Sequence, residues 1–88
     1  MEIQLKLYGS SKLLSENELL KLELPENSNV EQLRNSLKKL ISEKHSQSNL
    51  GELSKTAAFF SENDEVIDDN YRLKNKELVS IIPPIGGG

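Results

Sequence analysis

The sequence contains no cysteine at any of its 88 positions. A chain without cysteine forms no disulfide, no thiolate metal site and no cysteine nucleophile. It also lacks an apolar run near the roughly 20 residues that cross a bilayer, and its start has no basic segment followed by an apolar one. We therefore expect a cytoplasmic protein that does not act in a membrane.

Basic residues are fewer than acidic ones, with 11 Lys and Arg against 14 Asp and Glu, so the net charge is -3 at pH 7. Nucleic-acid-binding proteins carry clustered Lys and Arg, so no nucleic-acid partner is expected. The apolar fraction of 35% supports one small core. The length suits a single domain, which we place at residues 1–82, followed by a tail at residues 83–88.

Side chains that could hold a metal are scattered. His45 is the only histidine and lies in a polar segment, which predicts a surface residue. The acidic residues Asp64, Glu65, Asp68 and Asp69 lack the regular spacing and central glycine of a calcium loop. The serines, Ser10-Ser11 included, have no partner base. We expect no metal site and no side-chain nucleophile.

Alternation of apolar and polar residues predicts half-buried strands at residues 1–7 and 18–24, joined by a long loop. Pro25 ends the second strand, because proline cannot donate to a ladder. Ser28 and Glu31 have the spacing of a capping box, which predicts a helix start. Helical spacing then marks an apolar face: Val30, Leu33, Leu37, Leu40 and Ile41. The residues predicted to face solvent are Glu31, Gln32, Arg34, Lys38 and Lys39.

The second half predicts a polar loop at residues 43–55 that leaves room for a short turn, strands at 56–60 and 65–67, Leu73 in the core, and a last strand at 78–82. One helix must cover one face of this sheet. The first and last strands are the most apolar, so we place them side by side, parallel and central. The predicted fold is α+β, a ubiquitin-like β-grasp with a four- to five-stranded mixed sheet, one main helix on one face, and a flexible glycine tail.

Both faces of the sheet receive apolar side chains, from Phe59-Phe60 and from residues 78–82. The helix covers only one of them. The sequence leaves two interpretations open: a small second core under the long loop, or a partner-binding patch beside the tail.

The chain ends in an unusual segment: Pro83, Pro84, Ile85, Gly86, Gly87 and Gly88. Prolines hold the exit extended, and glycines fit a slot too narrow for a Cβ. Residues 83–88 could reach roughly 20 Å when extended. A loose end or a cloning remnant is the plain alternative. We expect the α-carboxylate of Gly88 to be the reactive group, delivered by the tail into the active sites of other proteins.

Residues 73–88 resemble the C-terminus of the small, sulfur-carrier subunit of molybdopterin synthase. The matching positions are Leu73, Val79, Pro83, Pro84, Ile85, Gly87 and Gly88, with Gly86 at the family's small-residue position. Two stretches depart from the pattern. Lys76-Glu77 stands where the family has a Gly-Asp turn, and residues 7–12 lack the aromatic residues and Arg-Glu pair often found there.

The resemblance implies a carrier cycle. An E1-like adenylyltransferase would use ATP and Mg²⁺ to convert the Gly88 carboxylate into an acyl-adenylate, and a sulfur donor would replace AMP to give a thiocarboxylate. The tail would then enter the large catalytic subunit of molybdopterin synthase, in a heterotetramer, and pass its sulfur to cyclic pyranopterin monophosphate. Pro83 to Gly87 would be the partner-binding residues. The chain itself would be a carrier with no bound cofactor, and an enzyme subunit only within the complex.

Other functions fit the same tail. A carrier serving thiamine or another thiolated product usually lacks the two prolines. A ubiquitin-like modifier would join Gly88 to lysines through isopeptide bonds. A binding module with an inert tail would keep its activity without Gly86 to Gly88.

Overall fold

The computed structural model describes residues 1–14, 17–44 and 53–83. Its elements follow the chain in this order: β1 (Glu2–Leu7), the 3-10 helix η1 (Gly9–Leu14), β2 (Leu19–Glu23), α1 (Val30–Lys44), α2 (Leu53–Thr56), β3 (Ala58–Phe60), β4 (Val66–Ile67) and β5 (Glu77–Ile82). Within these ranges no helix is long and apolar enough to cross a membrane.

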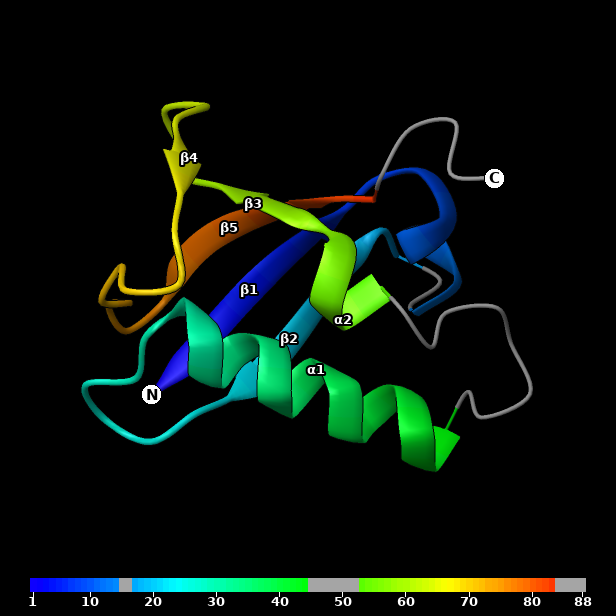
Figure 1. Ribbon diagram of the computed structural model, residues 1–88, viewed down its shortest axis with the longest axis horizontal. Coiled ribbons are helices and arrows are strands. Elements are labelled where there is room, and N and C mark those ends of the chain that lie inside the picture. Colours follow the sequence, from blue (N-terminus) through cyan, green and yellow to red (C-terminus); the bar gives the residue numbers. More distant parts are fainter. Residues whose placement is uncertain (15–16, 45–52, 84–88) are drawn as a thin grey trace.

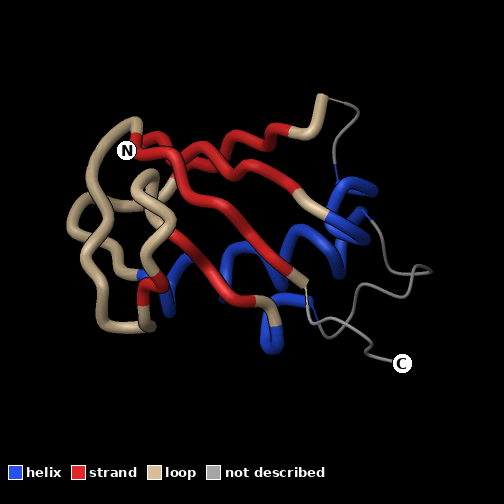
Figure 2. Tube along the Cα trace, turned by 90° about the horizontal axis from the view of Figure 1, so that it is seen from above, coloured by secondary structure: helices blue, strands red, loops and turns tan. Residues whose placement is uncertain are grey.

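The strands form one mixed five-stranded sheet in the order β2-β1-β5-β3-β4. The central strands β1 and β5 run parallel, in register from Ile3 opposite Glu77 to Leu7 opposite Ile81. Their outer neighbours β2 and β3 are antiparallel to them. Helix α1 lies across one face of the sheet (Figures 1 and 2). The predicted β-grasp fold, with its central parallel pair, is confirmed.

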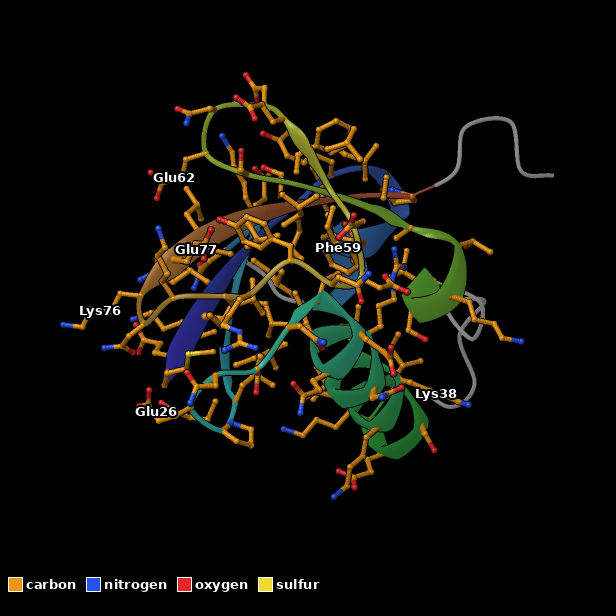
Figure 3. The ribbon with its side chains drawn as sticks, turned by 60° about the vertical axis from the view of Figure 1, so that its left-hand side comes forward. Glu26, Lys38, Phe59, Glu62, Lys76 and Glu77 are labelled. Carbon is orange, nitrogen blue, oxygen red and sulfur yellow. The ribbon has the colours of Figure 1, made fainter. Side chains whose placement is uncertain are left out.

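The core lies between α1 and the sheet, and the alternation along each strand decides which side chains enter it. Ile3, Leu5 and Leu7 of β1 are buried, as are Val79 and Ile81 of β5. Phe59, the largest fully buried side chain, points from β3 toward α1 (Figure 3). The apolar face of α1 buries Val30, Leu33, Leu37 and Ile41, while Leu40 is only partly buried. Leu73 enters the core from a turn, as predicted.

The capping box lies one residue later than the sequence suggested. Asn29 Oδ1 accepts a hydrogen bond from the backbone of Gln32 at 3.0 Å, and Gln32 Oε1 accepts one from the backbone of Asn29 at 2.9 Å. The predicted cap, Ser28, instead donates to the carbonyl of Pro25 at 2.7 Å and is fully buried. Asn29 and Gln32 make the same reciprocal pairing as a Ser-Glu box, so the prediction was wrong in register and right in kind.

Two connections contain helical segments, and the sequence indicated only the room for a short turn in the loop at 43–55. The loop after β1 includes η1, and α2 occupies residues assigned to the loop at 43–55 and to the third strand at 56–60. The third strand is therefore shorter than predicted, because Thr56 ends α2 and Ala57 joins it to β3. The second strand is shorter too, since Glu18 has a positive φ of 58° that does not fit an extended ladder.

Candidate functional site

The candidate site is the end of the sheet from which the C-terminal tail leaves. Strand β5 ends at Ile82, and Pro83 follows as a half-buried residue. The other predicted site residues, Pro84, Ile85, Gly86, Gly87 and Gly88, lie outside the described residues. We call Ile82 and Pro83 the tail root.

Both neighbours of β5 stop pairing at the tail root. On one side the parallel ladder with β1 ends at Leu7 opposite Ile81. On the other, Ala58 opposite Ile82 is the last pair with β3, and Ala57 before it leads back to α2. Pro83 has no N–H with which to extend either ladder. The chain therefore leaves the sheet at this residue.

A tight turn after β1 lies against the tail root. Gly9 has a φ of +56°, a conformation that glycine adopts without strain. A Cβ placed on Gly9 would lie 3.6 Å from Cγ and 3.7 Å from Cδ of Pro83. The backbone at Gly9 thus approaches the proline ring directly, and the η1 segment contacts β5 at its end (Figure 1).

The sheet face opposite α1 carries an open row of side chains across four strands. Lys6 of β1 is opposite Ser80 of β5, Ser80 is opposite Phe60 of β3, and Phe60 is opposite Val66 of β4. Val66 is 71% exposed, while Ser80 and Phe60 are partly buried. Figure 2 shows α1 on the other side of the strands. We call this the open face.

The open face is hollowed beside the tail root. Tyr8, Phe60, Asp64, Ser80 and Ile82 line a hollow of about 340 Å³. Tyr8 is 36% exposed at its rim. Tyr8 and Val66 expose apolar surface on this side of the sheet. The side chains at positions 13–16 of the long loop lie outside the described residues, so both interpretations left by the sequence stay open.

Lys6 lies beside this hollow. Lys6 Nζ lies 5.5 Å from the centroid of the Tyr8 ring. A hydrogen bond to the Tyr8 side chain and the electrostatic interaction with it raise the pKa of Lys6, with a further contribution from Asp64. Lys6 therefore keeps its positive charge over Tyr8, one of the residues that line the hollow.

The acidic run forms no metal site in the part of the chain that the structure describes. Asp64, Glu65, Asp68 and Asp69 are exposed, as expected. Asp69 accepts a hydrogen bond from Arg34 Nε at 2.8 Å. His45 lies outside the described residues, so its predicted surface position stays a prediction.

Comparison with known families gives a match over nearly the whole chain, since the model of the ThiS family covers residues 5–88. The chain belongs to the ThiS family. It is a ubiquitin-like sulfur carrier. None of the curated proteins matches it. More specific similarities of this ThiS-family chain are therefore those to solved structures.

The fold of this ThiS-family protein recurs in several of them. SAMP1 from Haloferax volcanii matches with a TM-score of 0.70 and 16% identity, covering 100% of both chains. A protein assigned as molybdopterin converting factor, subunit 1, from Pyrococcus furiosus matches with a TM-score of 0.69 and 17% identity, covering 96% of this chain and 98% of that one. A complex of subunits 1 and 2 of molybdopterin-converting factor from Helicobacter pylori 26695 matches with a TM-score of 0.61 and 26% identity, covering 100% of both chains. The first two likenesses establish the fold.

The structure adds residues to this ThiS-family site that the sequence analysis missed. Gly9 and Ser11 fall in the long loop that the sequence predicts after the first strand, and Lys6 falls within the predicted strand at residues 1–7. A signal was present for Gly9, because glycine is the usual residue where the backbone must turn or another group must approach it closely. No signal in the sequence alone pairs that glycine with Pro83.

Proposed function

We propose that this protein is the sulfur-carrier subunit of a molybdopterin synthase and acts through the carboxylate of Gly88. The observation that carries the proposal is the terminal pattern of two prolines, an aliphatic residue and glycines, directly after a core strand. The 26% identity, over both full chains, to a structure named as a complex of molybdopterin-converting factor subunits supports it.

The chemistry explains why the tail needs no side-chain catalyst. A carboxylate is a poor acyl donor, because oxide is a poor leaving group. An E1-like enzyme with ATP and Mg²⁺ makes the acyl-adenylate of Gly88 and releases pyrophosphate. A sulfur nucleophile then displaces AMP, which leaves the thiocarboxylate. Attack of that sulfur on cyclic pyranopterin monophosphate joins Gly88 to the substrate through a thioester. Water then cleaves the thioester, which leaves the sulfur on the substrate and restores the carboxylate, and the acid–base groups belong to the partners.

The geometry of the domain suits delivery of a terminus into another protein. The tail root leaves the sheet beside the hollow lined by Phe60, Ser80 and Ile82. We place the docking of the E1-like enzyme and of the large subunit on this open face, so that the tail enters the partner's active site while the sheet is held. Burying the area that the partly buried Phe60 and Ile82 still expose would stabilise such a complex by up to about 1 kcal/mol per side chain. The heterotetramer and the cytoplasmic location stay predictions.

Intact mass analysis tests the proposal. The protein is incubated with its E1-like enzyme, ATP, Mg²⁺ and a sulfur donor, and the mass gain of one oxygen-to-sulfur exchange is mapped to Gly88. The variant lacking Gly88 should show no exchange and keep the same circular dichroism and urea midpoint. A wild-type protein that gains no sulfur under conditions that release pyrophosphate would refute the carrier cycle.

Two further measurements separate the other candidates. Rescue of thiamine-deficient but not of molybdenum-cofactor-deficient cells would assign the carrier to thiamine. A ladder of larger conjugates that survives thiol reductant would show a protein modifier. We expect rescue of the molybdenum-cofactor-deficient cells and no such ladder.

A further inference from the structure

The turn that follows β1 is held rigid by a buried hydroxyl. Ser11 is fully buried. Its Oγ accepts a hydrogen bond from the backbone N–H of Tyr8 at 2.9 Å and donates to the Tyr8 carbonyl at 2.5 Å. The backbone N–H of Ser11 also donates to that carbonyl, at 3.1 Å. Because both functions of the buried hydroxyl are satisfied, opening the turn would leave polar groups unpaired.

Gly9 is the residue of this turn that contacts the tail root. Its φ of +56° lies in the left-handed region, and a Cβ built on it would face the ring of Pro83. Pro83 has no N–H to donate to a ladder, and the pairs of β5 with β1 and β3 end at Ile81 and Ile82. The contact with a rigid turn therefore replaces the ladder as the restraint on the first residue outside β5.

We propose that the turn formed by Tyr8, Gly9 and Ser11 is a positioning element for the tail. It sets the direction in which residues 84–88 leave the sheet, and so how readily Gly88 enters the activating enzyme. This inference rests on the proposed function and adds residues that touch neither ATP nor the reacting carboxylate. Gly9 and Ser11 are positioning residues and not catalytic ones.

Two substitutions at Gly9 separate positioning from bulk. Gly9→Asn and Gly9→Val both add a Cβ that meets Pro83 at an ordinary van der Waals distance. They differ in φ, because asparagine enters the left-handed region far more readily than a β-branched residue. Gly9→Asn should therefore keep the turn, whereas Gly9→Val should move it and shift Pro83.

The assay is pyrophosphate release by the E1-like enzyme as the concentration of the full-length carrier is varied. Gly9→Val should raise KM by about 10- to 100-fold, with kcat largely kept, because a tail held in the binding-competent direction in only about 1–10% of molecules lowers the apparent affinity by that factor. Gly9→Asn should stay near the wild-type KM. Ser11→Ala, which opens the same turn without adding any group beside Pro83, should raise KM in the same direction.

Asn27→Val is the matched control. Asn27 also has a positive φ, of 66°, but lies between β2 and α1, at the other end of the sheet. The same strain is introduced there, so a comparable fall in the urea midpoint is expected without a change in KM. If Gly9→Val and Asn27→Val, compared at matched stability, raise KM equally, or neither does, the turn has only a structural role and the inference is wrong.

A measurement on the isolated carrier makes the two hypotheses separable. In NMR spectra of the wild type, Hα of residue 9 should show a nuclear Overhauser effect to Hδ of Pro83. That effect should be lost in Gly9→Val, the amide shifts of residues 85–88 should move, and neither should change in Asn27→Val. Unmoved tail shifts in Gly9→Val would overturn the positioning role even if the wild type is adenylated. If no activating enzyme accepts the wild type, the proposed function is refuted. The NMR comparison of Gly9→Val with Asn27→Val still tests whether the turn positions the tail.

Discussion

Replacing Lys76 by glycine should stabilise the protein, although lysine is the more common surface residue. Lys76 has a φ of +65° in the turn before β5, where the resembling family carries glycine. Its side chain is exposed and points away from the domain (Figure 3). Its backbone N–H donates to the carbonyl of Glu2 at 2.6 Å, a bond that glycine keeps. Lys76 thus adopts a backbone conformation that glycine would adopt without strain.

The magnitude follows from two opposing terms. A non-glycine residue in the left-handed region costs about 1–2 kcal/mol. Glycine loses more chain entropy on folding, about 0.5–1 kcal/mol relative to alanine. The difference leaves Lys76→Gly more stable by about 0.5–1 kcal/mol, or roughly 2–8 °C in Tm for a domain of this size.

Urea unfolding followed by circular dichroism measures this, with the m value expected to stay constant. Lys76→Ala should change little, because alanine keeps the strain. Lys74→Gly is the control, since Lys74 is exposed in the same turn without a positive φ. It should lose about 0.5–1 kcal/mol through chain entropy alone. If Lys76→Gly is as destabilising as Lys74→Gly, the strain argument is wrong.

The remaining predictions concern stability measured in the same way. Arg34→Met should lower the free energy of unfolding by about 2–4 kcal/mol, because it removes hydrogen bonds from a charged donor, and Arg34→Lys should recover only part of the loss. Asn29→Ala should lose about 1 kcal/mol through the cap, and an unchanged midpoint would contradict the capping role. Tyr71 Oη donates to Glu77 Oε2 at 2.6 Å, and this bond raises the pKa of Tyr71. The neutral phenol is thus favoured by folding, so wild type should lose stability above about pH 10, and Tyr71→Phe should lose less over that range; parallel pH profiles would contradict it.

The sequence predicted the elements whose evidence is local. Period-two alternation identified β1, and helical spacing identified the buried face of α1. The two most apolar strands indicated the central parallel pair, which the register of β1 on β5 confirms. Each of these patterns arises because one face of a strand or helix is buried, and the side chains on that face recur with the period of the element.

The role of Arg34 could not be predicted in this way. The helical pattern assigned it to solvent, whereas its side chain is only 21% exposed. Its Nη1 donates to the carbonyls of Ser54, Lys55 and Ala57 at 3.1, 3.3 and 2.8 Å, and its guanidinium lies 4.7 Å from the Phe59 ring centroid. Arg34 donates hydrogen bonds to the carbonyl groups at the end of α2, a helix that the composition of the predicted polar loop did not indicate. A side chain whose partners are backbone groups of another segment leaves no periodic signal.

The site was predictable in its chemistry and not in its surroundings. The tail stands out because prolines and glycines follow a core strand. The turn at Gly9 and Ser11 becomes part of the site only when β1 and β5 are placed side by side. The hollow beside Ile82 likewise depends on which strand neighbours β5, since Phe60 and Tyr8 come from different segments.

The parallel pair of β1 and β5 places the tail at one end of the sheet and several stabilising polar contacts at the other end. Because β1 and β5 run in the same direction, the chain after Leu7 and the chain after Ile82 leave at one end of the sheet. The opposite end gathers the strained turn at Lys76, the pair of Tyr71 and Glu77, and the helix cap at Asn29, which also bridges to Arg72. Substitutions at that far end should therefore change the tail's reactions only through the folded fraction. Substitutions in the turn at Gly9 should change them in the folded protein itself, so the two groups of variants differ in the KM of activation at equal stability.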